Sequence, residues 1–496
     1  MLGSNGRTRN AKPLTPDCGA QGFDIPAPAA SLARVTPPAP ISPDNTRLSP
    51  AYHVGLLLVA IGMVALTVAY LALTALACWW VWFFATHYFL AIWELPLGRS
   101  FYGLMLLVVL SCTPLLIGAA IALAMVKPLF AGRGRHMQPL VLQPEIEPRL
   151  YALVQQVCGL VGAPAPKQIE LVCNLNAAAS FRRGLLSFLG HDLVLTLGLP
   201  LIAGLSEREL AGVIAHEFGH FRQGAGMRLS YLIRRINFWF ARVVYQRDAW
   251  DDAVADLTSN DSGWVAFMAG CVGISVGLSR AILKLLMLTG HFLSGLLLRQ
   301  MEYDADRWEM RVAGSAGFES TTLRLATLAH VLDDIHSEMR RTWRRQLQLP
   351  DNLPVLVEHR AGRLPAEKRA RIENQVGFAK TGWLDTHPSP SDRIRRARQL
   401  AEPGVLTSNA PARDLFENFD AISRLVTLAH YEDDLNVPTS PDFLIPLEAV
   451  IRGVAPAAPN AAGVPAASTE PQPAPAPIPM MAYDPSKFRK PSTTNE

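Results

Sequence analysis

The most pronounced hydrophobic pattern in the chain is a run from Val54 to Trp93 that contains no charged residue. A helix needs about 20 apolar residues to cross the hydrocarbon core of a membrane, so this run is long enough to span it. A second apolar run extends from Phe101 to Val126, and a transmembrane helix tolerates its internal Pro114 at the cost of a kink. The pattern predicts a transmembrane hairpin over residues 51–127.

A third apolar region, Trp264 to Leu298, is interrupted by Arg280 and Lys284. These charges leave uncharged stretches of 16 and 14 residues, and each is short for a complete crossing. Two interpretations remain open, a helical hairpin through the membrane and a set of helices packed against the membrane face. Translocating the two charges counts against the hairpin.

Positive charge is distributed unevenly around the first two spans. Only Arg99 lies in the connection between them, whereas the outer flanks carry Arg7, Arg9, Lys12, Arg34, Arg47, Lys127, Arg133 and Arg135. Both outer ends are therefore expected in the cytoplasm, with the protein in the cell inner (plasma) membrane. None of the six cysteines forms a C-x-x-C pair, which fits a reducing compartment.

Four regions follow from these patterns. Residues 1–50 and 436–496 are rich in proline and alanine and are expected to be disordered tails. The hairpin occupies 51–127, and a separate domain occupies 128–435 with the apolar region 264–298 as an insertion. The net charge of +4 gives no reason to expect a nucleic-acid partner.

The polar pattern changes at Ser206, where a helix is expected to begin. The sequence Ser206-Glu-Arg-Glu209 has the form of a capping box, and Leu205 and Leu210 occupy the two positions of a hydrophobic staple. Apolar residues then recur at helical spacing and predict one buried face.

This helix carries the motif His216-Glu-Phe-Gly-His220. Histidines four residues apart lie on one helical face, so both imidazoles can bind one zinc ion. Glu217 lies between them, where a carboxylate can accept a proton from the metal-bound water. The alternative is a pair of core histidines beside a surface glutamate.

A catalytic zinc site usually needs a third protein ligand. Glu302 is the best candidate, because Asp306 follows it by one helical turn and can accept the free ring N–H of a ligating histidine. The alternative is a solvated acidic helix face that pairs with Arg299 and Arg307.

These residues resemble the membrane zinc metallopeptidases of the HtpX type, which are related to the CaaX prenyl endopeptidases. Four pieces match in the family's order: Asn176-Ala-Ala-Ala-Ser180, the His216 motif, Glu302-x-x-x-Asp306, and Thr386-His387-Pro388 followed by Arg393-Ile394. The resemblance covers roughly residues 140–400. It implies a mainly α membrane protein whose zincin-like, mostly helical domain contains a small β-sheet, predicted around Ile169–Val172 and Leu193–Leu197.

The resemblance also implies the chemistry of the site. One zinc ion per chain would be bound by His216, His220 and Glu302, with Glu217 as the general base. His387 resembles a group that stabilises the oxyanion. Asp306 and Arg393 resemble groups that do not bind the metal but hold the ligands and the fold around them in place. Asn176, Ala177 and Ala178 would line the cleft as a strand edge to which substrate adds.

The expected activity is an endopeptidase that cleaves membrane proteins in quality control, with protein substrates and the lipid bilayer as partners. Two alternatives stay open. A CaaX-type peptidase that processes prenylated proteins would have more transmembrane helices, and a non-enzymatic scaffold with a structural zinc site would need a fourth protein ligand.

Overall fold

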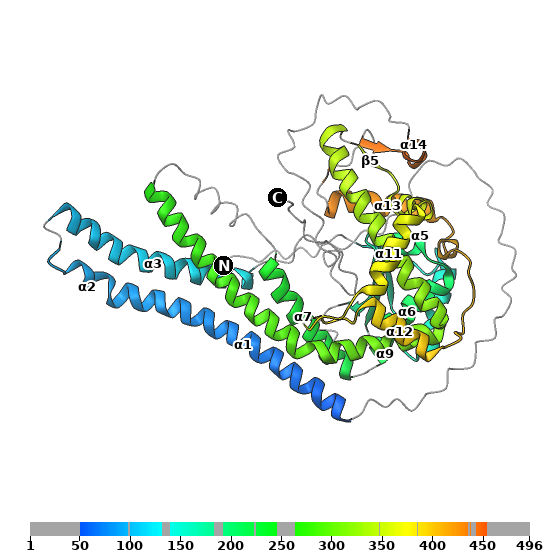
Figure 1. Ribbon diagram of the computed structural model, residues 1–496, viewed down its shortest axis with the longest axis horizontal. Coiled ribbons are helices and arrows are strands. Elements are labelled where there is room, and N and C mark those ends of the chain that lie inside the picture. Colours follow the sequence, from blue (N-terminus) through cyan, green and yellow to red (C-terminus); the bar gives the residue numbers. More distant parts are fainter. Residues whose placement is uncertain are drawn as a thin grey trace, which may run out of the picture. The chain divides into compact units, whose positions relative to one another are not determined.

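The computed structural model describes residues 50–97, 100–130, 139–182, 192–222, 225–245, 263–346, 348–383, 385–434, 437 and 443–453. Most of the predicted tails, residues 1–50 and 436–496, lies outside these ranges, as do Arg99, Arg133 and Arg135 of the charge argument. Residues 444–452 instead form a short strand, which pairs with an earlier strand, and a helix, so ordered structure continues beyond the predicted boundary at residue 435. The described chain is mostly helical and contains small sheets, which confirms the predicted fold class (Figure 1).

Three helices in the described part of the chain are long and apolar enough to cross a membrane. The first two runs form α1 (Pro50–His87) and α3 (Phe101–Phe130), which pack against each other and are joined through the short α2 (Phe89–Trp93). The third is α9 (Gly263–Gln346), which contacts both α1 and α3. The chain is therefore a membrane protein.

The apolar region 264–298 contains no hairpin of its own, because it is one continuous stretch of α9. This stretch leads directly into the turn that carries Glu302, so the region is not a separate insertion. Its antiparallel neighbour is α7 (Ala225–Tyr245), which packs on α9 and α1. Helix α7 is amphipathic and carries Arg228, Arg234 and Arg235.

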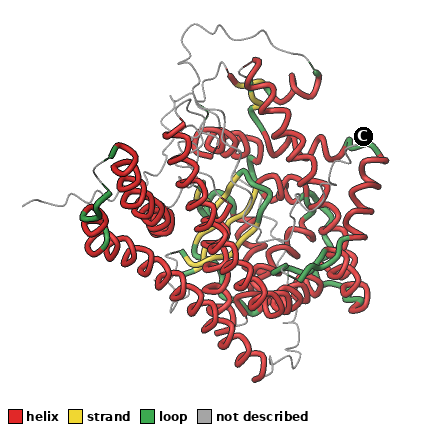
Figure 2. The backbone as a smooth tube through the Cα atoms, turned by 60° about the vertical axis from the view of Figure 1, so that its left-hand side comes forward, coloured by secondary structure: helices red, strands yellow, loops and turns green. Residues whose placement is uncertain are grey.

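A four-stranded sheet lies among the helices of the catalytic domain (Figure 2). Its strands are β1 (Leu140–Leu142), β2 (Gln168–Val172), β3 (Ala177–Phe181) and β4 (Leu193–Gly198), in the order β1-β2-β4-β3. Both predicted strand regions are confirmed. Strand β3 pairs with β4 alone, in antiparallel register, and is therefore an edge strand.

The helix of the histidine motif is α6 (Glu207–Arg222). Its capping box is formed as predicted, since the Ser206 N–H donates to Glu209 over 2.9 Å and the Glu209 N–H donates to the Ser206 hydroxyl over 3.3 Å. Leu205 and Leu210 are both buried in the main core. Two backbone N–H groups at the start of the helix therefore have hydrogen-bond partners where the helix enters the core.

The remaining elements complete the domain around α6 and α9. They are α4 (Pro148–Val161), α5 (Leu199–Gly204), β5 (Leu349–Pro350), α10 (Leu353–Gly362), α11 (Ala366–Phe378), α12 (Pro390–Leu400), η2 (Ala412–Leu415), α13 (Phe419–Ala429), η3 (His430–Asp434), β6 (Leu444–Ile445) and α14 (Leu447–Arg452). Helices α10, α11 and α12 pack against α9, and β5 pairs with β6 in parallel.

Helix α9 is broken at Gly314, whose φ of 81° lies in the left-handed region. A neighbouring segment satisfies the backbone groups that the break exposes. Ser315 N–H donates to the Glu402 carbonyl over 2.8 Å, and Val405 N–H donates to the Val312 carbonyl over 2.9 Å. The kink therefore ends the straight part of α9 one helical turn beyond Glu309.

Two glycines on α6 allow a close approach to α9. A Cβ atom at Gly212 would lie 2.8 Å from the Ala313 Cβ, and one at Gly219 would lie 3.3 Å from the Ala305 Cα. The glycines are seven residues apart and so lie on the same face of α6 as His216. Their missing side chains let the backbone of α6 lie directly against α9.

We expect Gly212→Ala to destabilise the protein by about 1–3 kcal/mol, because the added methyl overpacks the contact with Ala313. Gly159→Ala is the matched control: Gly159 lies in α4, and a Cβ there would meet nothing within 4 Å. That control should be neutral or stabilising by about 0.5–1 kcal/mol. Thermal unfolding of both purified variants measures the difference, and equal stabilities would contradict the close-crossing argument.

Candidate active site

The crossing of α6 and α9 brings the two predicted motifs together. His216 Nε2 lies 3.6 Å from Glu302 Oε2, and His220 Nε2 lies 3.7 Å from Glu302 Oε1. The possible ligand atoms of these three residues all lie within 4.8 Å of one another. His216 and Glu302 are completely buried. The alternative of a solvated acidic face is therefore wrong, as is pairing with Arg299 and Arg307.

The geometry of the three residues fits a zinc ion. Ligands that bind tetrahedral zinc at about 2.0–2.2 Å are separated from one another by about 3.3–3.6 Å, close to the separations in this site. His216 Nε2 and Glu302 Oε2 are buried and have no hydrogen-bond partner within the described chain. Buried polar atoms without partners are costly, so a cation between them would remove the penalty.

The opposite side of the His216 ring faces two carboxylates. Nδ1 lies 3.1 Å from Asp306 Oδ1 and 3.6 Å from Glu309 Oε2. Burial disfavours the imidazolium, but Asp306 and Glu302 outweigh burial and raise the pKa of His216 to about 10. A metal ion that binds Nε2 would displace the proton from that nitrogen, and the carboxylate at Nδ1 would keep the other proton in place.

Asp306 is in turn held by Arg393 of α12. The guanidinium donates through Nε over 2.8 Å and through Nη2 to the second oxygen, so the pair is bidentate. Such a pair holds the carboxylate of Asp306 in one orientation and stabilises its negative charge. The Arg393 side chain is therefore directed into the protein, whereas those of Arg395 and Arg398 in the same helix are largely exposed.

Glu217 lies on the other side of the histidines, next to the sheet edge. Its Oε2 accepts a hydrogen bond from the Ala179 N–H over 3.4 Å, and its Oε1 is buried with no partner within the described chain. Burial is the main cause that raises the pKa of Glu217 to about 7. A carboxylate in this range can accept and release a proton near neutral pH.

His387 comes to the site from the loop that precedes α12. Its Nδ1 lies 3.4 Å from Glu302 Oε2. The structure therefore gathers the predicted histidines and carboxylates, together with Arg393, into one cluster. Asn176 precedes strand β3, and Ala177 and Ala178 begin it, beside Glu217.

Two further residues of the cluster were missed by the sequence analysis. Arg234 of α7 donates through Nη2 to Glu302 Oε1 over 2.5 Å. Glu309 is buried beside His216 and continues the helical face of Glu302 and Asp306, so extending that face by three residues could have found it. Nothing in the sequence near Arg234 indicates its contact, which depends on how α7 packs against α9.

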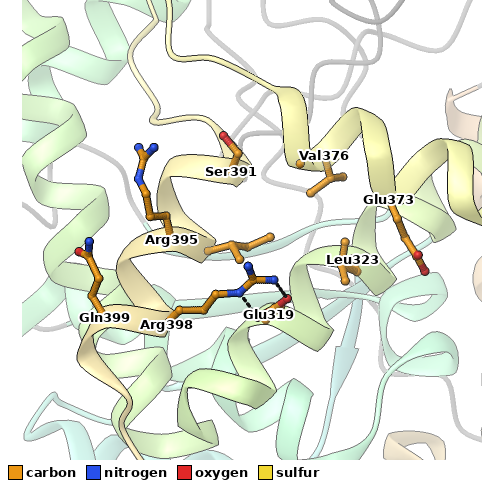
Figure 3. A pocket seen from close by; sticks show the side chains of 10 residues that line it. Glu319, Leu323, Glu373, Val376, Ser391, Arg395, Arg398 and Gln399 are labelled. Carbon is orange, nitrogen blue, oxygen red and sulfur yellow. Dashed lines mark hydrogen bonds and ion pairs between the residues drawn. The ribbon is translucent and has the colours of Figure 1, made fainter.

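A pocket elsewhere in the described chain is separate from this cluster (Figure 3). It lies between α9, α11 and α12, and its lining includes Glu319, Leu323, Val376, Arg395 and Arg398. Arg398 donates to both carboxylate oxygens of Glu319 and ties α12 to α9 there. None of the predicted site residues is part of this lining.

Comparison with known proteins agrees with this site. Residues 144–401, just over half of the chain, match the model of Peptidase family M48. The chain belongs to peptidase family M48. The matched range contains both histidines, Glu302 and His387. It extends from just after β1 to the end of α12.

Curated relatives of this M48 peptidase carry the name HtpX. The chain is 27% identical over 261 residues to "Protease HtpX homolog" of Ralstonia pickettii, a match that covers 52% of this chain and 75% of the relative. It is 24% identical over 216 residues to "Protease HtpX" of Acinetobacter baylyi, covering 43% and 60%. No solved structure matches this chain. The protein is thus a membrane protease, a hydrolase that acts on peptides or proteins.

Proposed function

We propose that the protein is a zinc-dependent endopeptidase that cleaves membrane proteins, with one zinc ion bound by His216, His220 and Glu302. The carrying observation is the buried cluster of those three side chains, with unpartnered ligand atoms 3.6 Å apart between His216 and Glu302. Bound zinc would supply a Lewis acid and lower the pKa of a water molecule. Among the described residues, the group of possible ligands around Glu302 has no fourth member, which favours a catalytic site with a position for water over a structural site.

The chain's own residues have distinct roles in this proposal. Glu217 accepts the proton of the attacking water and delivers it to the leaving amine. His387, beside Glu302, donates a hydrogen bond to the developing oxyanion. Asp306, held by Arg393, orients His216, and Arg234 orients Glu302.

Extended substrate is proposed to pair with the free edge of β3. Gly198 N–H donates to Asn176 O and Arg182 N–H donates to Asp192 O, so the even-numbered residues of this strand bond to β4. The odd-numbered residues Ala177 and Ala179 therefore direct their backbone groups away from β4, as the Ala179 contact with Glu217 illustrates. A substrate strand placed there would lie beside the general base.

We further propose a cytoplasmic catalytic domain in the inner membrane and a role in protein quality control. The charge distribution around the first two spans supports the orientation. Three helices capable of crossing the membrane support an HtpX-type protease over a CaaX-type enzyme with more spans. Processing of prenylated proteins remains the second candidate.

Replacing the proposed base tests the reaction. Glu217→Gln should retain zinc and fold but lose about 10²–10⁴-fold in kcat, because an amide cannot accept the proton. Glu207→Gln is the matched control on the first turn of the same helix, where the carboxylate accepts from Ser408 instead. Casein cleavage and metal analysis of both proteins give the comparison, and near wild-type cleavage by Glu217→Gln would refute the peptidase mechanism.

The ligand set gives a second prediction. Glu302→Ala should abolish zinc binding, because it removes a ligand and leaves Arg234 beside the histidines. Asp306→Ala should weaken zinc affinity by about 10–100-fold, because the carboxylate acts only through His216. Titration with a competing chelator measures both affinities, and full zinc occupancy in Glu302→Ala would place the third ligand elsewhere.

If substrate pairs with the edge of β3, every second backbone amide of the substrate should matter for cleavage. N-methylation of peptide amides that face β3 should lower kcat/KM by about tenfold each, the equivalent of one lost hydrogen bond. Methylation of the alternate amides should have little effect. Ala178→Pro is expected to disrupt the sheet itself, because Ala178 pairs with Thr196 of β4. Uniform tolerance of methylation along the substrate would show that the edge does not bind it.

A further inference from the structure

The loop between α11 and α12 exposes an aromatic side chain beside a membrane helix. Trp383 is 86% exposed, and Phe378 at the end of α11 is 81% exposed. A single exposed aromatic residue is common on protein surfaces, so its surroundings must show what it contacts. Tryptophan is enriched at membrane–water interfaces, where its apolar ring and polar N–H suit the headgroup region.

The backbone of this loop is attached to α9. Arg299 Nη1 donates to the Gly382 carbonyl over 3.1 Å and to the Asp385 carbonyl over 2.8 Å. A Cβ at Gly295 would lie 3.8 Å from the Trp383 carbonyl oxygen. Trp383 therefore lies at the level of residues 295–299 of α9.

This level is where α9 changes from apolar to charged residues and where α1 begins. On α9, Phe292 and Leu296 expose 61% and 73% of their surface, and Arg299 follows them. On α1, Leu56 lies two residues into the uncharged run and packs in one buried cluster with Leu298. The end of the apolar part of α9 and the start of α1 thus lie at the same height, as expected at the boundary of a bilayer.

The loop is rigid enough to transmit this contact to the active site. Asp385 Oδ2 accepts from the Gly382 N–H over 2.7 Å, and the Ser389 N–H donates to the Thr381 hydroxyl over 2.8 Å. His387 lies between these two ties, with its ring 3.4 Å from Glu302. The segment that reaches Trp383 is therefore the segment that places His387.

We propose that Trp383 is a membrane-interface anchor that inserts into the headgroup region beside α9 and holds the His387 loop against the active site. The partner is the lipid bilayer, and the surface continues the lipid-facing side of α9. The anchoring contact is independent of zinc chemistry. The effect on His387 rests on the proposed function.

Fluorine NMR of the full chain in lipid nanodiscs tests the anchor. Fluorotryptophan labels all ten tryptophans, and the resonance lost in Trp383→Phe identifies position 383. A lipid carrying a nitroxide near its headgroup should broaden this resonance more than a water-soluble gadolinium chelate does. Trp82 in α1 is the lipid-facing reference, and Trp308, which is 8% exposed in the domain core, should respond to neither reagent.

Two results would overturn the anchor. Stronger broadening by the chelate would place Trp383 in water. That result is expected if only the part of α9 before Lys284 lies in the membrane and residues 284–299 lie outside it. If neither reagent broadens the Trp383 resonance, another part of the protein covers this side chain and it contacts no lipid.

Activity measurements test separately whether the Trp383 anchor affects the position of the His387 loop. Trp383→Ser should lower kcat several-fold in nanodiscs but not in detergent, with unchanged zinc content. Leu425→Ser on α13, an exposed apolar position outside this loop, is the control and should behave as wild type in both. Equal kcat of Trp383→Ser and wild type in nanodiscs would disprove the coupling to His387. Absence of zinc-dependent cleavage by the wild type would instead refute the proposed function and leave the NMR result standing.

Discussion

The close crossing of α6 and α9 is the contact on which the rest of the site depends. A metal ligand set from two helices requires their backbones to approach closely enough for short side chains to converge. Gly212 and Gly219 provide this approach, since a side chain at either position would press on Ala313 or on the backbone of Ala305. A separation increased by one methyl group would move both histidines away from Glu302.

The position of α9 links the membrane to the chemistry. The same helix packs against α1 and α3 in its apolar half and carries Glu302, Asp306 and Glu309 directly beyond it. Its kink at Gly314 then turns the chain back toward the domain. Because a helix is stiff over this length, the depth of α9 in the bilayer determines the height of the site above it.

Buried charge is unusually dense around the histidines. Arg393 neutralises Asp306, and Arg234 pairs with Glu302, while both carboxylates approach His216. Removing one member would leave a buried charge without its partner, which is strongly destabilising. The network therefore constrains the chain even where a residue touches no substrate, and it explains why helices α7 and α12 must dock on α9 in fixed positions.

The sequence alone determined the local features, because they depend on short-range periodicity. The uncharged run after Val54, the capping box at Ser206 and the four-residue spacing of the histidines each specify an element within a few turns of chain. The pairing of Glu302 with the histidines was also predictable, but only through resemblance to a family. The tertiary structure decided the rest. It turned region 264–298 into the first half of the Glu302 helix and brought Arg234 and Trp383 to α9. These outcomes depend on contacts between residues tens to hundreds of positions apart, where the free energy comes from packing and charge pairing that no local pattern encodes.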